Sequence, residues 1–207
     1  MSLWLKLIIA GLSFTALLFH SGVFLKKIRK SMFVYFTNVT LAFCVLFFIA
    51  VAIRGYSQFL IWSGGYIVLC VFMTMAVYHF VLVPVRRKEE SDSLFSFSDI
   101  VSHYVIPVLV IVDWVFFAEK GKFGQNYPFL WTVPSILYFF ATVAYAKLAT
   151  PKETGEKRYP YYFFDFDKLG FKKVSLNVMI LLLIVVLLGS ILLFLDFSLS
   201  GQELRNS

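Results

Sequence analysis

The sequence predicts an all-α membrane protein, a bundle of six transmembrane helices, and three observations lead to this fold class. Hydrophobic residues make up 60% of the 207 residues, with 25 Phe, a share that soluble domains of this length do not reach. The apolar residues gather in six stretches, each about as long as the roughly 20 helical residues that cross a hydrocarbon core. These stretches are continuous, without the alternation of a β-barrel strand, so we expect helices.

The first three spans are expected at residues 3–25, 33–53 and 59–85. The first is interrupted only by Lys6, is longer than a signal-peptide core and has no small-residue cleavage site, so we expect it to be retained as a helix. A basic connection separates it from the second span, and Arg54 follows the second. The third continues without a charged residue to Arg86.

The last three spans are expected at residues 99–118, 129–149 and 173–197. Ser98 stands where it can cap the fourth helix, because its hydroxyl can accept from a first-turn N–H. The aromatic run from Tyr159 to Phe166 precedes the sixth span and is too apolar for a solvated loop, so we expect it at the interface or folded back over the bundle. The six spans are expected to form one domain over residues 1–207.

Basic residues predict the orientation of the spans. The connections after the first, third and fifth spans hold four, three and seven Lys and Arg residues, fourteen in all, against five on the opposite side. Cytoplasmic loops carry the excess of Lys and Arg, so we expect both termini outside the cytoplasm. The formal net charge of +7 is then mainly an orientation signal, and no nucleic-acid partner is expected.

Most polar side chains within the spans lie near the basic ends. At 1.5 Å per helical residue, they fall about 5–12 Å from the cytoplasmic boundary. Polar groups at this depth are costly, so each needs a partner or a function. The set comprises His20, Ser21, Thr37, Asn38, Thr40, Tyr78, His79, His103, Thr142, Tyr145, Ser175 and Asn177.

Thr37 and His103 stand out in this layer because they have equivalent depths on two spans that run in the same direction. A hydroxyl nucleophile needs a base within hydrogen-bond reach, and equal depth is a condition for that contact. The second, fourth and sixth spans all begin on the basic side, so their partly positive N-termini favour an anionic ligand head. The Phe-, Leu- and Val-rich walls suit an acyl chain. Asp113, about 15 Å further along its helix, is expected to be a pairing residue.

Three motifs in three regions of the chain resemble those of a known family. They are Tyr35-Phe36-Thr37-Asn38, the run from His103-Tyr104-Val105-Ile106-Pro107 to Asp113-Trp114, and Tyr159-Pro160-Tyr161 followed by aromatic residues and Asp165. Together they resemble the androgen-induced-gene family of six-helix membrane proteins, most closely its bacterial branch. The resemblance implies a threonine hydrolase of fatty acid esters of hydroxy fatty acids in a bacterial cell membrane.

Carried over by motif, the resemblance implies that Thr37 is the nucleophile and His103 the base. Asn38, Asn177 and Asp165 are expected to support the substrate, the imidazole or the oxyanion, with Tyr145 as a further polar neighbour. We expect a lipid substrate with an acyl chain and an anionic head, near the cytoplasmic leaflet, with no cofactor and no metal. The oligomeric state is not indicated.

Three alternatives remain open from the residues alone. The polar layer can be half of a transport path or a lipid-binding site without catalysis, although the outer half of the spans is nearly apolar. His20, His79 and His103 are expected on one side and would suit zinc, without an i, i+4 spacing to support it. A purely structural or partner-binding membrane protein is the third alternative.

Overall fold

The computed structural model describes residues 2–26, 30–88, 96–148 and 159–206. Within these residues it contains helices and no strands, and six of the helices are long and apolar enough to cross a membrane. They cover Leu3–Ser21, Phe36–Arg54, Gln58–Val85, Phe97–Phe117, Tyr127–Leu148 and Phe166–Gly201. The predicted fold class is confirmed. The end of the fifth predicted span, residue 149, lies outside the described residues.

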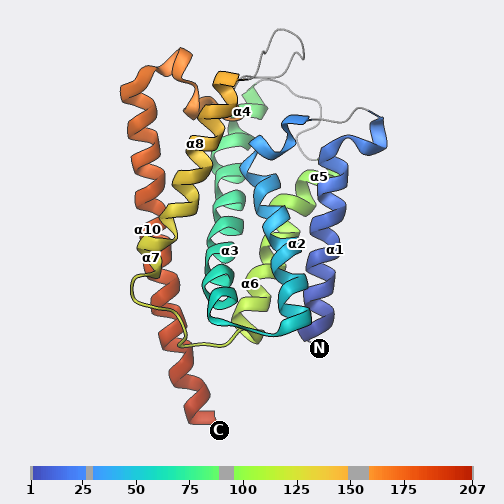
Figure 1. Ribbon diagram of the computed structural model, residues 1–207, viewed down its shortest axis with the longest axis vertical. Helices are drawn as coiled ribbons and strands as arrows, with labels where there is room; N and C mark the ends of the chain where they lie inside the picture. Colours follow the sequence, from blue (N-terminus) through green and yellow to red (C-terminus); the bar gives the residue numbers. More distant parts are fainter. Residues whose placement is uncertain (1, 27–29, 89–95, 149–158, 207) are drawn as a thin grey trace. The chain divides into compact units, whose positions relative to one another are not determined.

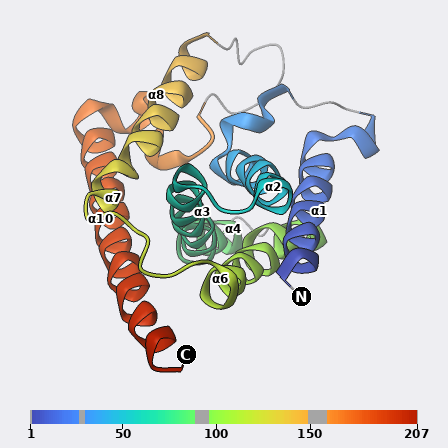
Figure 2. The same cartoon turned by 60° about the horizontal axis from the view of Figure 1, so that its bottom comes forward.

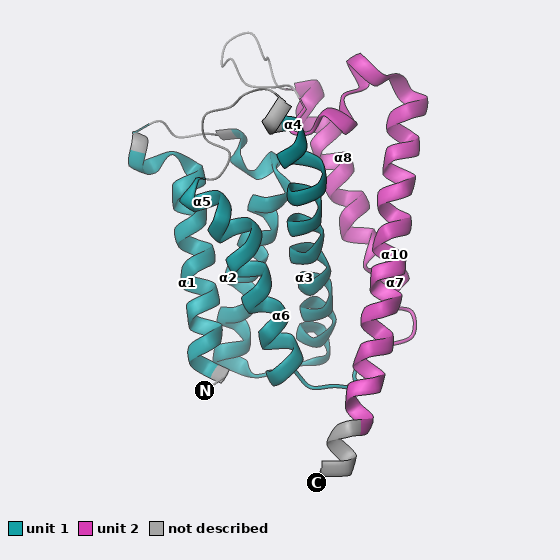
Figure 3. Ribbon diagram, turned by 180° about the vertical axis from the view of Figure 1, so that it is seen from behind, with its two compact units in different colours: residues 1–122 teal, residues 123–207 magenta. Residues whose placement is uncertain are grey.

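The chain divides into two compact units, residues 1–122 and 123–207, which are coloured separately in Figure 3. The first unit holds four of the six spans and the second holds two.

Four helices of the first unit form a closed ring. They are α1 (Ser2–Ser21), α2 (Phe36–Arg54), α3 (Gln58–Val77) and α6 (Ile106–Phe117). Each contacts the next, and α6 contacts α1, as the view towards the ends of the helices shows (Figure 2). Their shared core is mostly apolar, with Ile9, Phe48, Val71 and Ile106 at most 1% exposed, and it also buries the hydroxyl-bearing Ser13, Thr40 and Thr74. The ring therefore provides a dry frame for any polar group at its ends.

The first two spans differ from the prediction where α1 ends and α2 begins. The helix α1 ends at Ser21 rather than residue 25, because Gly22 takes a φ of 75°, the left-handed conformation that terminates helices. The short 3₁₀ turns η1 (Val23–Leu25) and η2 (Lys30–Val34) follow, and α2 begins at Phe36 rather than residue 33. This places Thr37 in the first turn of α2.

Two π-helical turns interrupt the third and fourth spans. The turn η3 (Tyr78–Leu82) joins α3 to α4 (Val83–Lys88), and η4 (Val101–Val105) joins α5 (Phe97–Ile100) to α6. Each begins six residues before a proline, Pro84 or Pro107. Proline has no N–H and its ring collides with the carbonyl four residues earlier. The widened turns relieve this by pairing the Val83 N–H with the Tyr78 carbonyl and the Ile106 N–H with the Val101 carbonyl.

The fourth span begins slightly earlier than predicted. Ser96, rather than Ser98, is the N-cap of α5, since its hydroxyl accepts from the Asp99 N–H at 3.1 Å. The cap fixes the first turn of this span, and the carbonyl of Asp99 takes part in the site described below.

The second unit contains α7 (Tyr127–Leu130), α8 (Thr132–Leu148) and α10 (Phe166–Asn206), which Figure 1 shows in yellow to red. The sixth span starts at Phe166 rather than residue 173, and Gly170, with a φ of 71°, bends α10 near its start. The aromatic segment before it includes the turn η5 (Tyr162–Phe164) and buries Tyr159, Tyr161 and Phe164. The expectation that this segment is not a solvated loop is confirmed.

Candidate functional site

The polar residues of the first unit converge where α2 begins. His20 comes from the last turn of α1, Thr37 and Asn38 from the first turn of α2, Tyr78 from η3, and Ser102 and His103 from η4. The helices α2 and α6 are not neighbours in the ring, but η4 contacts α2 at this end. The site thus depends on the π-helical turn that precedes Pro107.

Thr37 and His103 are in contact, as their equal depth predicted. The Thr37 Oγ1 atom lies 3.3 Å from His103 Nε2, and His103 Nδ1 lies 3.0 Å from the backbone carbonyl oxygen of Asp99. A carbonyl can only accept, so Nδ1 carries the proton of the neutral ring. Nε2 then presents its lone pair to the hydroxyl, and Thr37 donates. This is the arrangement of a hydroxyl beside a general base.

The group that orients the His103 ring differs from those expected. Asn38, Asn177 and Asp165 were the expected candidates, whereas the contact at Nδ1 is the main-chain oxygen of Asp99. A backbone carbonyl one turn earlier on the same segment is not marked by any residue type. The sequence therefore did not predict that the Asp99 carbonyl contacts His103. Because this carbonyl accepts at Nδ1, it fixes the tautomer of the ring.

An aromatic ring stacks on one face of the His103 imidazole. Tyr78 stacks on His103 with ring centroids 3.8 Å apart and an interplanar angle of 19°. Tyr104 meets Tyr78 edge-on at 5.8 Å and bonds to His79 Nδ1 through its hydroxyl at 3.0 Å. His103 is only 7% exposed, whereas Thr37 is half-buried. The base is therefore immobilised while the hydroxyl keeps some access.

A second hydrogen-bonded chain lies beside the first. His20 Nδ1 is 2.5 Å from Asn38 Oδ1, the Asn38 Nδ2 group donates to the Met32 carbonyl at 2.7 Å, and Ser102 Oγ is 3.5 Å from His20 Nε2. Asn38 was expected to support Thr37 or His103, but its amide orients the other imidazole. Ser102 was not expected; the only signal was its position next to His103.

The remaining predicted site residues belong to the second unit. The Asn177 side chain donates to the Phe163 carbonyl at 2.9 Å, and Asp165 Oδ1 accepts from the Lys168 N–H at 3.1 Å, capping the start of α10. Tyr145 is half-buried on α8. Their contribution to the Thr37 site stays a prediction.

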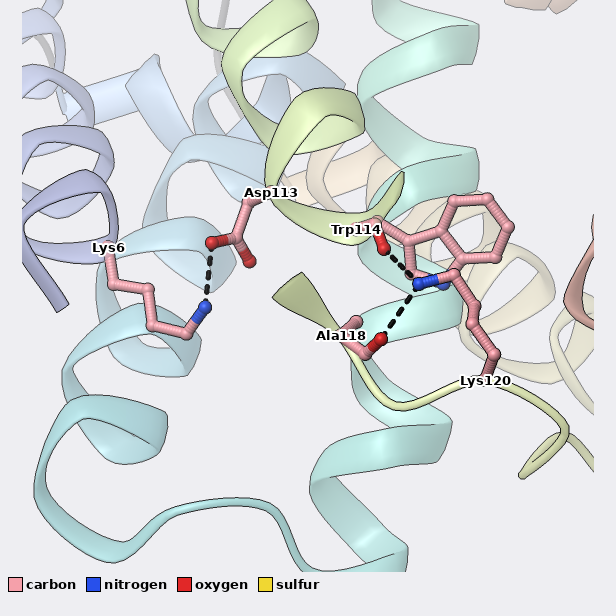
Figure 4. Close-up of polar contacts among 5 residues, drawn as sticks. All are labelled: Lys6, Asp113, Trp114, Ala118 and Lys120. Atoms are coloured by element: carbon pink, nitrogen blue, oxygen red, sulfur yellow. Dashed lines mark hydrogen bonds and ion pairs between the residues drawn. The ribbon is translucent and has the colours of Figure 1, made fainter. Parts of the chain in front are cut away.

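The opposite end of the first unit holds charged groups that are paired (Figure 4). Lys6 Nζ lies 2.6 Å from Asp113 Oδ1, with the two residues 5% and 2% exposed. Lys120 is 7% exposed and donates to the carbonyls of Trp114 and Ala118 at 2.5 and 2.7 Å, at the C-terminal end of α6. The expectation that Asp113 is a pairing residue is confirmed, and its partner is Lys6.

Tyr56 lies in the connection between α2 and α3 near this ion pair. The Lys6 ammonium is 5.6 Å from the centre of its ring. Burial, and then the negative charges of Asp113 and Glu119, raise the pKa of the Tyr56 phenol above its usual range. The phenol therefore stays neutral beside the Lys6–Asp113 pair.

Metal binding finds no support in the described residues. Within the described part of the chain, no group of three or more His, Cys, Asp or Glu side chains is placed to hold a metal ion. The nitrogens of His20, His79 and His103 instead contact Asn38 and Ser102, Tyr104, and Thr37 and Asp99, respectively.

No family model, no curated protein and no solved structure matches this chain. Membership of the androgen-induced-gene family therefore stays a prediction, and the functional argument depends on the geometry of the site.

Proposed function

We propose that the protein is an intramembrane lipid-ester hydrolase in which Thr37 is the nucleophile and His103 the general base. The observation that carries the proposal is the 3.3 Å contact between Thr37 Oγ1 and His103 Nε2, together with the bond from Nδ1 to the Asp99 carbonyl. The separation is long for a hydrogen bond to a hydroxyl, as in many catalytic sites before substrate tightens them.

The chemistry follows from these positions. Thr37 Oγ attacks the ester carbonyl carbon while His103 Nε2 takes the hydroxyl proton. The tetrahedral intermediate collapses, the alcohol leaves with that proton, and the acyl group remains as an ester on Thr37. A water molecule then loses a proton to His103 and attacks the acyl carbon, which releases the carboxylic acid and returns the proton to Thr37.

The first turn of α2 supplies a donor for the developing oxyanion. N–H groups in the first turn of a helix have no intrahelical partner, and the N-terminus of a helix favours negative charge. Thr37 lies in this turn, and we assign its own N–H as the donor, because the N–H groups of Asn38 and Val39 already bond to the Tyr35 carbonyl. This role does not require the Asn177 amide, which donates to Phe163.

The surroundings favour an amphipathic substrate. The ring of helices presents an apolar interior, and its outer surface carries exposed apolar side chains such as Phe43, Leu46 and Val108. The segment that precedes Thr37 in the sequence is basic, with Lys26, Lys27, Arg29 and Lys30, which suits an anionic head. We propose fatty acid esters of hydroxy fatty acids, with the site near the cytoplasmic leaflet and both termini outside.

A fluorophosphonate probe on the purified protein in micelles tests the proposal. We expect labelling of Thr37, located by mass spectrometry, together with turnover of p-nitrophenyl laurate. Thr37→Ala should abolish both, and Thr37→Ser should retain them. Thr15→Ala is the matched control, since the Thr15 hydroxyl is bonded to the Gly11 carbonyl at 2.8 Å and has no imidazole partner among the described contacts.

Two outcomes would overturn the assignment. Labelling that persists in Thr37→Ala would remove Thr37 from the nucleophile role. Lipid binding without turnover in the wild-type protein would instead favour a transporter or lipid-binding protein, the alternative that the sequence left open.

A further inference from the structure

The second hydrogen-bonded chain of the first unit is interleaved with the Thr37–His103 pair. Asn38 follows Thr37 on α2, and Ser102 precedes His103 on η4. Thr37 and His103 thus form the first hydrogen-bonded chain, whereas their sequence neighbours Asn38 and Ser102 belong to the second. His20 connects Asn38 to Ser102, with its ring nitrogens at 2.5 Å and 3.5 Å from their side-chain oxygens.

The positions of the protons in this chain follow from its ends. The Met32 carbonyl can only accept, so the Asn38 atom that faces it at 2.7 Å is the amide nitrogen. The other end of the Asn38 amide is therefore the oxygen, and His20 Nδ1 carries the proton that this oxygen accepts. In the neutral ring His20 Nε2 is then an acceptor, and the Ser102 hydroxyl donates to it.

The chain has the order of a serine–histidine–asparagine triad, yet Ser102 is poorly placed to attack a substrate. Ser102 is 2% exposed and Asn38 is 5% exposed, whereas Thr37 is half-buried. A nucleophile has to reach the ester carbonyl, so burial assigns the Ser102 chain a different role from that of Thr37.

We propose that His20 is a positioning residue that holds the first turn of α2 against η4, and thereby sets the distance between Thr37 and His103. This inference rests on the proposed hydrolase function. The helices α2 and α6 are opposite members of the ring, so the short chain through His20 ties together the two turns that bear the reacting groups. Misplacement of reacting groups by about 1 Å costs on the order of a hundredfold in rate.

Two His20 variants distinguish positioning from proton transfer. Glutamine has an NH₂ group that can donate to Asn38 Oδ1 and an oxygen that can accept from Ser102, which are the roles of neutral His20, but it does not titrate. Alanine has neither group. We expect His20→Ala to lower kcat for p-nitrophenyl laurate by about ten- to a hundredfold with KM within about twofold. His20→Gln should restore kcat to within about threefold of the wild-type value and leave the shape of the pH–rate profile unchanged.

Ser102→Ala tests the positioning role of the second hydrogen-bonded chain if His20→Ala fails to fold. It removes one hydroxyl and should lower kcat in the same direction. Where His20→Ala does fold, the double variant should fall no further than His20→Ala alone. Fluorophosphonate labelling of Thr37 should slow in parallel with kcat, because both depend on the Thr37–His103 distance.

The outcomes separate this inference from the function on which it rests. Wild-type turnover in Thr37→Ala would overturn the hydrolase mechanism and this inference with it. Loss of turnover in Thr37→Ala, with an unchanged kcat in folded His20→Ala or Ser102→Ala, would overturn the positioning role alone. An equal loss in His20→Ala and His20→Gln, with one limb of the pH–rate profile missing, would also overturn it, because His20 would then transfer a proton itself.

Discussion

Both ends of the first unit hold polar side chains within a mostly apolar ring of helices, but the partners of these side chains differ between the two ends. Where α2 begins, hydroxyl, amide and imidazole groups are joined by contacts of 3.3 Å (Thr37–His103), 3.5 Å (Ser102–His20) and 2.5 Å (His20–Asn38). At the other end, Lys6 pairs with Asp113 at 2.6 Å and Lys120 donates to two carbonyls at 2.5 and 2.7 Å.

This difference indicates that the Thr37 end is suited to a reaction, whereas the Lys6–Asp113 end stabilises the fold. A buried charge has to be paired, because an unpaired charge in an apolar interior is strongly unfavourable. Such a pair is closed to other partners, which suits a structural contact. A hydroxyl beside an imidazole can pass its proton to the ring nitrogen as it attacks a carbonyl, and the long Thr37–His103 contact leaves room for a substrate to tighten it. The following variants test this division.

The largest effect is expected for His103→Gln. It removes the base but leaves an amide of similar reach, so we expect the rate of Thr37 labelling and the turnover of p-nitrophenyl laurate to fall by about a hundred- to ten-thousandfold. The free energy of unfolding should change little relative to that loss. Labelling at the wild-type rate would show that the Thr37–His103 contact is only structural, as the Lys6–Asp113 pair is.

Next in size is Asp113→Ala. It leaves the Lys6 ammonium buried without its carboxylate, so unfolding in mixed micelles should be easier by about 3–5 kcal/mol. Lys6→Met combined with Asp113→Leu should recover most of this stability, because the pair is then replaced by apolar side chains. Thr37 labelling should be retained in the folded fraction of each variant. A loss of Thr37 labelling in the folded fraction would show that the two ends of the unit depend on each other. It would contradict the assignment of reactivity to one end and stability to the other.

A smaller effect is expected for Lys120→Met, which keeps the apolar stem and removes the donor to Trp114 and Ala118 at the end of α6. Hydrogen bonds from charged groups contribute about 1.5–3 kcal/mol, and we expect a loss of stability of this order. Lys122→Met is the matched control, because Lys122 is exposed. Equal stability of the two variants would contradict a capping role for Lys120.

The smallest effect concerns the ring that stacks on His103. Tyr78→Leu should slow Thr37 labelling by about two- to tenfold, equivalent to the roughly 0.5–1.5 kcal/mol of an aromatic pair. Tyr78→Phe keeps the ring and should label faster than Tyr78→Leu. The same rate for Phe and Leu would indicate that stacking does not orient the imidazole.

Much of the fold and part of the site could be predicted from the residues. Apolar stretches long enough to span a bilayer identify helices wherever they occur, since the requirement is local. Equal depth on parallel spans, together with the family resemblance, singled out Thr37 and His103, although equal depth is only a condition for their contact. The predicted ends of the first and last spans were wrong by several residues, because Gly22 terminates α1 and the segment before Gly170 adds a turn to α10.

The rest of the site could not be predicted because it depends on how the helices are rotated about their axes. Depth placed His20, Asn38 and His103 at one level without showing that Asn38 faces His20 and not His103. Lys6 was counted only as an orientation signal, whereas it is the partner of Asp113. Two π-helical turns, each set by a downstream proline, change which side chains face inward, and helical periodicity does not report that change.

The sequence by itself determined that this chain is a helical membrane protein and which hydroxyl and imidazole share a depth, because hydropathy and helical rise are properties of each segment alone. The tertiary structure decided which nitrogen of His103 faces Thr37, that His20 joins Asn38 to Ser102, and that Lys6 pairs with Asp113. Those features depend on the contacts between helices, since a tautomer or an ion pair is defined only by the atom that a neighbouring element brings to it.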